Sequence, residues 1–219
     1  MNTDTAFSPF IGICRHRLHT DGQGVTTLAA FHGCPLHCRY CLNPQCKTSS
    51  GKWLWHSPES LYEEVRQDEL YFLATEGGIT FGGGEPLLQT KFIHQFREIC
   101  GTQWRITVET SLHVPSSYIE TIIEDIDEYI IDIKDMNPVV YQNYTQCDNK
   151  LTLDNLSLLH AYGKAKDCLI RTPLIAGFNS VDHIISSQRQ LRHMGFPYVS
   201  ISLSPSHHSE KLLFTLLVS

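Results

Sequence analysis

The sequence predicts an α/β protein with an open (β/α)6 partial barrel of parallel strands, and three observations support this fold class. Short apolar runs alternate with helical segments, which is typical of βα units around a parallel sheet. Most candidate functional residues follow the ends of these runs, where such folds carry their sites. The chain of 219 residues is also long enough for one such domain, so we predict that residues 1–219 form a single domain.

Six segments rich in β-branched and apolar residues are predicted to be the strands. In chain order they are Val25–Phe31, Ile79–Phe81, Trp104–Val108, Tyr129–Ile133, Cys168–Arg171 and Tyr198–Leu203. The turn Asp21–Gly24 leads into the first strand, and the segment before this turn gives no clear strand signal.

Helices are predicted between the strands. One starts at Ser57 and Pro58, an N-cap followed by proline at the first helical position, and continues to Gly77. The others are predicted from Thr90, as N-cap, to Gly101, after Pro115, over Leu151–Tyr162 and over Val181–Met194.

The composition is that of a globular protein without the charge of a nucleic-acid binder. Hydrophobic residues make up 42% of the chain and the formal net charge is -6, so there is no basic excess to neutralise phosphates. No apolar run reaches the roughly 18 residues of a membrane span, and Met1–Phe10 lacks the pattern of a signal peptide. We therefore expect a cytoplasmic protein whose eight cysteines are reduced and available for metal binding.

The most informative motif is the loop Cys34–Cys41, which places three cysteines at C-x3-C-x2-C spacing. Thiolates bind soft metals and iron–sulfur clusters. A [4Fe–4S] cluster normally takes four thiolates, so three would leave one iron open for chemistry. The alternative is a structural zinc site with His37 or Cys46 as the fourth ligand. The isolated cysteines are predicted to be buried structural thiols: Cys14, Cys100, Cys147 and Cys168.

A second motif lies further along the chain, where three consecutive glycines precede Glu85 and Pro86. Glycine lets the backbone turn sharply and approach a ligand closely. Such a run alone is most often an ordinary turn between a strand and a helix. Because it follows the cysteine loop, we interpret it as part of a ligand site.

Together the two motifs resemble the radical S-adenosylmethionine superfamily, whose members carry a C-x3-C-x-aromatic-C loop and a GGE motif. Tyr40 is the aromatic residue here. The resemblance implies that Cys34, Cys38 and Cys41 hold a [4Fe–4S] cluster and that S-adenosylmethionine chelates the fourth iron. It also implies that the glycine run binds the amino group of S-adenosylmethionine, that Glu85 braces this run, and that Tyr40 contacts adenine.

Further segments narrow the resemblance to the activases of glycyl-radical enzymes, of the pyruvate formate-lyase activating enzyme type. Asp132–Asn137 is similar to the family's D-[LI]-K-x-M-[ND], and Arg171–Asn179 resembles R-x-P-[LV]-[IV]-P-G-x-N. Shorter similarities to DGPG, C-x-N-P and L-P-Y-H occur at Asp21–Gly24, Cys41–Pro44 and Ser204–His207. One departure is Ser111-Leu112, where the family has Asn-Gly. The similarity covers residues 20–208.

The resemblance implies roles for residues near the strand ends. Lys134 and Arg171 would contact the carboxylate and ribose region of S-adenosylmethionine, and His207 its adenosyl end. Glu109 and Asp132 would lie near the cofactor and help to hold a monovalent cation. From the pattern alone, Asp132 and Lys134 are equally explained as the polar face of an edge strand. The predicted catalytic residues are Cys34, Cys38, Cys41 and Lys134, and the predicted cofactor-binding residues are Tyr40, Leu42, Gly83, Gly84, Glu85, Glu109, Asp132, Ile133, Lys134, Arg171 and His207.

The implied function is the activation of a partner enzyme. In this family the reduced cluster passes one electron to S-adenosylmethionine, and the resulting 5′-deoxyadenosyl radical abstracts a hydrogen from a backbone glycine of the partner. The expected cofactors are a [4Fe–4S] cluster, S-adenosylmethionine and a monovalent cation. The expected partners are a glycyl-radical enzyme and a flavodoxin or ferredoxin as electron donor, under anaerobic conditions, without nucleic acid or membrane.

Two alternatives remain at this stage. Another small radical S-adenosylmethionine enzyme, of the 7-carboxy-7-deazaguanine synthase type or an anaerobic ribonucleotide reductase activase, shares both motifs. The segments Asp132–Asn137 and Arg171–Asn179 favour a glycyl-radical enzyme activase over these. From a different class, the chain could be a non-catalytic module that binds a cluster or zinc.

Overall fold

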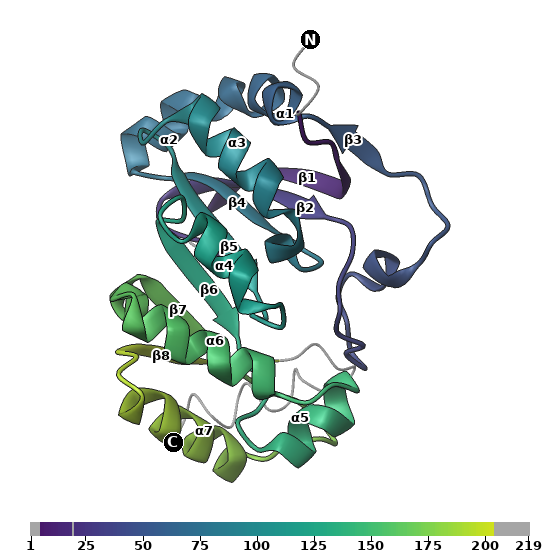
Figure 1. Cartoon of the computed structure of the whole chain (residues 1–219), viewed down its shortest axis with the longest axis vertical. Helices are drawn as coiled ribbons and strands as arrows, with labels where there is room; N and C mark the ends of the chain where they lie inside the picture. The colour runs from purple at the N-terminus through teal and green to yellow at the C-terminus, as the bar shows by residue number, and fades with distance from the viewer. Residues whose placement is uncertain (1–4, 19, 204–219) are drawn as a thin grey trace. The chain divides into compact units, whose positions relative to one another are not determined.

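The computed structural model describes residues 5–18 and 20–203, in which helices and strands alternate along most of the chain (Figure 1). The chain divides into two compact units. The first comprises Met1–Pro35 and Asn43–Ile130, and the second comprises Leu36–Leu42 and Ile131–Ser219. The predicted site residue His207 lies outside the described residues.

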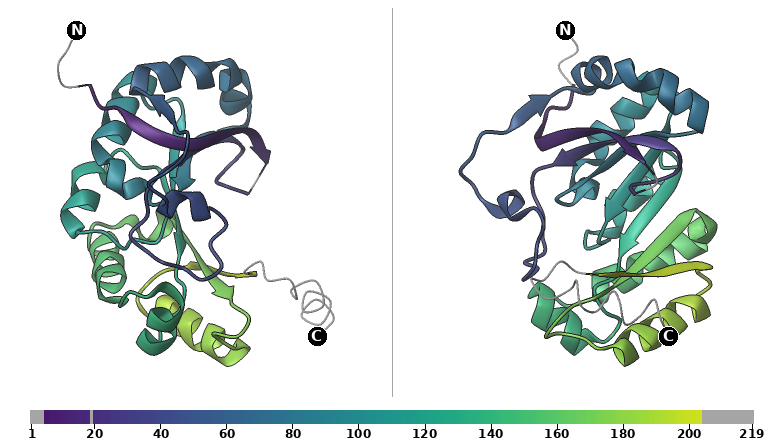
Figure 2. Two further views of the ribbon diagram at one scale, coloured as in Figure 1. Left: turned by 90° about the vertical axis from the view of Figure 1, so that its right-hand side faces the viewer. Right: turned by 180° about the vertical axis from the view of Figure 1, so that it is seen from behind.

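The first unit contains strands in the order β3-β1-β2-β4-β5, followed by β6, the strand at which the units divide. The bounds are β1 Ser8–Leu18, β2 Val25–Phe31, β3 Leu54–His56, β4 Gly78–Gly83, β5 Arg105–Thr110 and β6 Glu128–Asp132. β2, β4 and β5 are parallel, with Leu28 opposite Thr80 and Thr80 opposite Thr107. β1, the purple strand in Figure 2, is antiparallel to both β2 and β3.

In the second unit, β7 (Cys168–Leu174) and β8 (Tyr198–Leu203) form a parallel pair, with Ile170 opposite Val199. The helices of this unit are α5 (Pro138–Thr145), α6 (Lys150–Ala161) and α7 (Val181–His193), and α7 packs against β7 and β8 (Figure 1). β3 is an edge strand in the first unit and β8 in the second, so the sheet is open. Parallel strands joined through helices, in an open sheet, confirm the predicted α/β class.

The helices of the first unit are α1 (Pro58–Val65), α2 (Glu69–Thr75), α3 (Thr90–Cys100) and α4 (Ser116–Ile122). α3 packs against both α1 and α4 (Figure 1). Beneath these helices lies a buried aromatic cluster, in which the ring of Phe31 stacks on Phe10 at 4.3 Å and on Phe81 at 5.3 Å. Phe92 meets Phe31 edge to face at 5.5 Å, a favourable arrangement for aromatic pairs. No helix within residues 5–18 and 20–203 has the length and apolar content required to cross a membrane.

The predicted helix from Ser57 to Gly77 starts as expected but is interrupted. Ser57 caps α1 in a capping box, whereas a short 3-10 turn at Arg66–Asp68 separates α1 from α2. Asp68 is fully buried and accepts hydrogen bonds from Arg15 Nε and Thr27 Oγ1, both at 2.8 Å. This buried carboxylate lies where the helical pattern breaks.

The sequence analysis missed β1, β3 and α5. β1 contains Pro9 and Gly12, which weaken a strand signal, and β3 is only three residues long. The first residue of α3 is Thr90, so the prediction of Thr90 as its N-cap is wrong by one position, and Gln89 is the N-cap.

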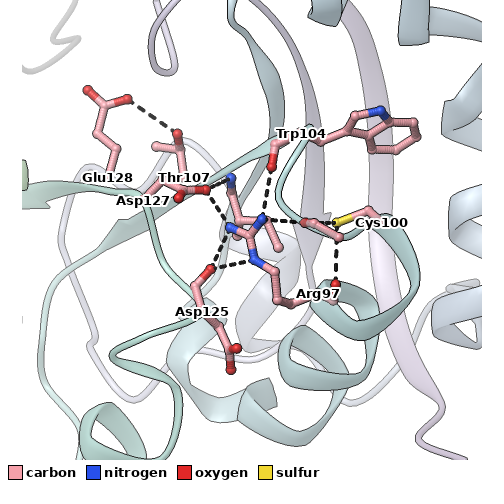
Figure 3. Close-up of polar contacts among 9 residues, drawn as sticks. Arg97, Cys100, Trp104, Thr107, Asp125, Asp127 and Glu128 are labelled. Carbon is pink, nitrogen blue, oxygen red and sulfur yellow. Dashed lines mark hydrogen bonds and ion pairs between the residues drawn. The ribbon is translucent and has the colours of Figure 1, made fainter.

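Arg97, near the end of α3, fixes the turns that precede β5 and β6 (Figure 3). Its guanidinium donates to the carbonyl oxygens of Gly101 at 2.7 Å and Trp104 at 2.9 Å. It also donates to the Asp125 carbonyl, at 2.9 Å from Nε and 2.6 Å from Nη2, and it pairs with the Asp127 carboxylate. The Arg97 side chain is only 11% exposed, so the guanidinium is held by these protein acceptors rather than by water.

Arg97→Ala is therefore expected to lower the free energy of unfolding by about 3 kcal/mol, because several partly buried acceptors lose their donor together. Arg97→Lys should recover only part of this loss, since an ammonium cannot reproduce the planar fork. Urea denaturation measures both. The matched control is Arg66→Ala, which removes an exposed pair with Glu63 and should cost less than about 1 kcal/mol. Equal losses for the two alanine variants would contradict the role given to Arg97.

Candidate functional site

The predicted metal-binding loop follows β2 and contributes residues to both units: Cys34 belongs to the first, and Cys38 and Cys41 to the second. All three are half-buried, and none is in a disulfide. Three such thiols supply the donor chemistry that an iron–sulfur cluster needs. The residue types therefore fit a cluster. Over the described part of the chain, however, no three His, Cys, Asp or Glu side chains are grouped as in a metal site. The assignment of the three cysteines as cluster ligands thus stays a prediction.

Within the second unit, the loop segment Leu36–Leu42 is anchored on the C-terminal end of α5. The N–H of His37 donates to the carbonyl of Thr145 at 2.9 Å, and the N–H of Arg39 donates to the carbonyl of Tyr144 at 3.2 Å. These two hydrogen bonds hold the backbone on both sides of the second cysteine. α5, which the sequence analysis missed, thus supports the loop.

Tyr40 packs against two aromatic residues of the second unit. Its ring centroid lies 5.8 Å from that of Phe178 and 6.3 Å from that of Tyr144, whose hydroxyl donates to the Tyr40 carbonyl at 3.5 Å. Tyr40 as a whole residue remains 41% exposed, which leaves part of it available for the predicted contact with adenine. Leu42, another predicted cofactor-binding residue, is largely exposed.

Lys134 is held by Asp132, the last residue of β6. Lys134 Nζ lies 2.9 Å from Asp132 Oδ2, and the Lys134 side chain is mostly buried. Burial alone would lower the pKa of Lys134, but the Asp132 carboxylate and the Cys38 thiol outweigh burial and raise the pKa. Lys134 therefore stays a cation in the neighbourhood of Cys38.

Ile133 and Arg171 meet through their backbones in the second unit. Ile133 is buried, and its N–H donates to the Arg171 carbonyl at 3.0 Å. Arg171 is the fourth residue of β7, so the prediction that it ends its strand is wrong. β7 continues to Leu174 because its residues remain paired with β8, with Pro173 opposite Ser202.

In the first unit, the glycine run leaves β4 in close contact with the backbone at the end of β2 and directly after it. The N–H of Gly84 donates to the Phe31 carbonyl at 2.9 Å, and the N–H of Glu85 donates to the Gly33 carbonyl at 2.7 Å. A Cβ at Gly84 would lie 2.0 Å from the Gly33 oxygen, so only glycine fits there. Gly83 has a φ of 88°, which also favours glycine.

Glu85 is buried and accepts four hydrogen bonds. Oε1 accepts from Thr110 Oγ1 at 2.6 Å and from the Leu87 N–H at 3.2 Å. Oε2 accepts from the Ser111 hydroxyl at 2.6 Å and from the Ser111 N–H at 2.9 Å. Burial raises the pKa of the Glu85 carboxyl, and the hydrogen bonds from Ser111 and Thr110 only partly offset this. Glu85 thus ties the glycine run to the end of β5.

Glu109, on β5, lies beside the start of the same glycine run. A Cβ built on Gly82 would come within 3.1 Å of Glu109 Oε2. Gly82 therefore leaves the space that the Glu109 side chain occupies. Within the first unit, the structure thus places Glu109 next to the predicted cofactor-binding glycines.

The remaining cysteines differ in their environments. Cys46 is buried, and its Sγ donates to the Phe31 carbonyl at 3.5 Å, so it has a structural partner in the first unit. Cys100 and Cys168 are buried as predicted, and desolvation raises the pKa of Cys100 to about 11 and that of Cys168 to about 12. The prediction of buried thiols is wrong for the exposed Cys14 and for the half-buried Cys147.

Sequence reasoning missed the residues that support the candidate ligands. Ser111 was interpreted only as a departure from a family pattern, Thr110 was given no role, and Asn43 was interpreted only as part of a C-x-N-P tail. Their partners are far away in the chain: Ser111 contacts Glu85, and the Asn43 side chain contacts Gly83. No local periodicity reports such pairs.

A family model for the Radical SAM superfamily matches residues 29–185 of this chain. Among relatives, the (2S)-3-sulfopropanediol dehydratase activating enzyme of Klebsiella oxytoca is 34% identical over 76% of this chain and 71% of its own length. The 4-hydroxyphenylacetate decarboxylase activating enzyme of Clostridioides difficile is 26% identical over 90% of this chain and 81% of its own length.

A solved structure, native anSMEcpe with bound AdoMet, has a TM-score of 0.57 and 16% sequence identity to this chain. The match covers 78% of this chain and 49% of that one. At this identity the similarity supports the fold alone.

Proposed function

Because this chain belongs to the radical SAM superfamily, and within it to the activating enzymes of glycyl-radical enzymes, we propose that it cleaves S-adenosylmethionine reductively to activate a glycyl-radical enzyme. The observation that carries the proposal is the three-cysteine loop Cys34–Cys41, which lies inside the matched residues 29–185. The identity of the relatives favours this function over the other small radical SAM enzymes considered above.

Cys34, Cys38 and Cys41 would hold the [4Fe–4S] cluster. When bound, the cluster and S-adenosylmethionine supply the electron and the radical that removes a hydrogen from a backbone glycine of the partner. The chain itself binds and orients. Lys134, kept cationic beside Asp132, would bind the cofactor's carboxylate.

Further residues complete the proposed cofactor site. Gly83 and Gly84 would approach the amino group, Tyr40 and Leu42 the adenine, and Ile133, Arg171 and His207 the ribose and adenosyl portions. Glu109 and Asp132 are proposed to help bind a monovalent cation through carboxylate oxygens, the ligand type that hard cations prefer. The 40% exposure of the Asp132 side chain supports its availability.

We also propose the cellular setting. The protein would act in the cytoplasm under anaerobic conditions, with flavodoxin or ferredoxin as electron donor and without nucleic acid. The net charge of -6 supports the last point. We retain the proposal that residues 1–219 act as one domain, with the family similarity at residues 20–208.

Anaerobic reconstitution with iron and sulfide tests the proposed function. The expected result is a [4Fe–4S] absorption spectrum, release of 5′-deoxyadenosine with dithionite, and a glycyl doublet in electron paramagnetic resonance after incubation with the right partner. Candidate partners are the dehydratase and the decarboxylase named by the two relatives. Stoichiometric zinc without cleavage of S-adenosylmethionine would leave only the non-catalytic module.

A further inference from the structure

The side chain of Asn43 contacts the backbone of the glycine run. Asn43 Nδ2 donates to the carbonyl oxygen of Gly83 at 3.0 Å. Both residues belong to the first unit, although 40 positions separate them in the chain. Asn43 therefore connects the exit of the cysteine loop directly to the predicted binding site for the cofactor's amino group.

The local sequence does not explain this use of Asn43. It precedes Pro44 at the start of a 3-10 helix, a position where asparagine normally accepts hydrogen bonds from the next backbone N–H groups. Its side chain makes no such bond. The same dipeptide occurs at Asn137-Pro138, where Asn137 Oδ1 does accept from Val139 N–H at 2.9 Å and caps α5.

The Gly83 carbonyl lies in a backbone that is fixed on its other side. Gly83 ends β4 with a φ of 88°, and the next two N–H groups, of Gly84 and Glu85, donate to the carbonyls of Phe31, at the end of β2, and of Gly33. A carbonyl oxygen has two lone pairs, so the bond from Asn43 leaves one acceptor direction for a second donor. An amino group that binds iron through its lone pair keeps N–H groups, so it is a suitable donor.

We propose that Asn43 is a positioning residue, which orients the Gly83 carbonyl so that this carbonyl accepts a hydrogen bond from the amino group of S-adenosylmethionine. This inference rests on the proposed function. Aspartate cannot perform this role, because its carboxylate has no N–H to donate and repels the carbonyl oxygen. Asn43→Asp nevertheless preserves the size of the side chain and its capability as a helix cap.

The test compares two ligands on reconstituted protein by equilibrium binding: S-adenosylmethionine and its analogue that lacks the α-amino group. Asn43→Ala and Asn43→Asp should each raise the Kd for S-adenosylmethionine about five- to tenfold, since losing a hydrogen bond costs about 1 kcal/mol and each tenfold in Kd is about 1.4 kcal/mol. The Kd for the analogue should change less than about twofold, which is under 0.5 kcal/mol. Asn137→Asp is the matched control and should leave both affinities unchanged.

The ligand comparison separates positioning from a merely structural role. If the Asn43 variants weaken both ligands equally, or weaken neither, the inference is wrong while the proposed function stands. If the unaltered reconstituted protein fails to bind S-adenosylmethionine, both the proposed function and this inference are wrong. Melting temperatures of the metal-free variants show whether they fold.

Discussion

Replacement of Cys34, Cys38 or Cys41 by alanine is expected to reduce the iron bound after anaerobic reconstitution to background. A [4Fe–4S] cluster left with two protein thiolates lacks the ligands that hold it. The release of 5′-deoxyadenosine should disappear with the cluster absorption. Iron and sulfide analysis, together with the visible spectrum, measures the loss independently of activity.

Cys46→Ala is the matched control for this series. Cys46 is also close to the loop in sequence, but its Sγ is buried and donates to the Phe31 carbonyl. Its loss should cost stability by about 1 kcal/mol and leave the iron content unchanged. The zinc alternative makes the opposite prediction: with Cys46 as fourth ligand, this variant would lose its metal. Retention of iron by any of the three loop variants would contradict the proposed ligand set.

The sequence allowed the central fold to be predicted because β2, β4, β5 and β7 each contain a short segment rich in β-branched and apolar residues. A short apolar segment bounded by turn residues is the local pattern of a buried strand, and this pattern can be recognised without knowing the partner strands. β1 escaped because Pro9 and Gly12 interrupt the pattern and its second half is exposed. Its antiparallel pairing with β2 depends on a partner elsewhere in the chain, which a local pattern does not show.

α5 was missed although a usable signal was present. Asn137-Pro138 is the same kind of start as Ser57-Pro58, which was recognised, and Val140 and Tyr144 follow at helical spacing. Asn137 was interpreted only as the last residue of the motif Asp132–Asn137, and no element was predicted for Pro138–Thr145. A residue of a cofactor-binding motif can also be the N-cap of a helix, so the two interpretations of Asn137 are compatible.

The candidate site shows a different limit. The residue types of the loop and the glycine run could be read from the sequence, because their chemistry follows from thiols and from absent side chains. The residues that support the site could not be predicted from the sequence. Ser111 and Thr110 become hydrogen-bond partners of Glu85 only when β4 and β5 are paired. Leu112 makes the point further. It is buried with a φ of 56° at a position where the family pattern has glycine, and nothing in the sequence indicated this backbone conformation.

Glu85→Ala is expected to destabilise the first unit by about 3–5 kcal/mol, because four donors around a buried carboxylate lose their acceptor at once. Thr110→Val removes only one of these donors and should cost about 1–2 kcal/mol. The loss of unfolding free energy for Glu85→Gln should lie between these two values. The amide retains one oxygen acceptor but places N–H groups against the Ser111 or Thr110 donors. Urea denaturation gives all three values.

The pH dependence of the difference between the unaltered protein and Glu85→Gln identifies the carboxyl group as the cause. Burial raises the pKa of Glu85 in the folded protein, so the folded state holds its proton to a higher pH than the unfolded state does. The stability contributed by Glu85 is then fully present below the unfolded pKa of about 4.3 and declines as pH rises through the raised folded pKa. The advantage of the unaltered protein over Glu85→Gln should therefore shrink from acid toward neutral pH. A difference that grows over this range would show that the four hydrogen bonds outweigh burial, and that Glu85 braces the glycine run as a fully ionised carboxylate.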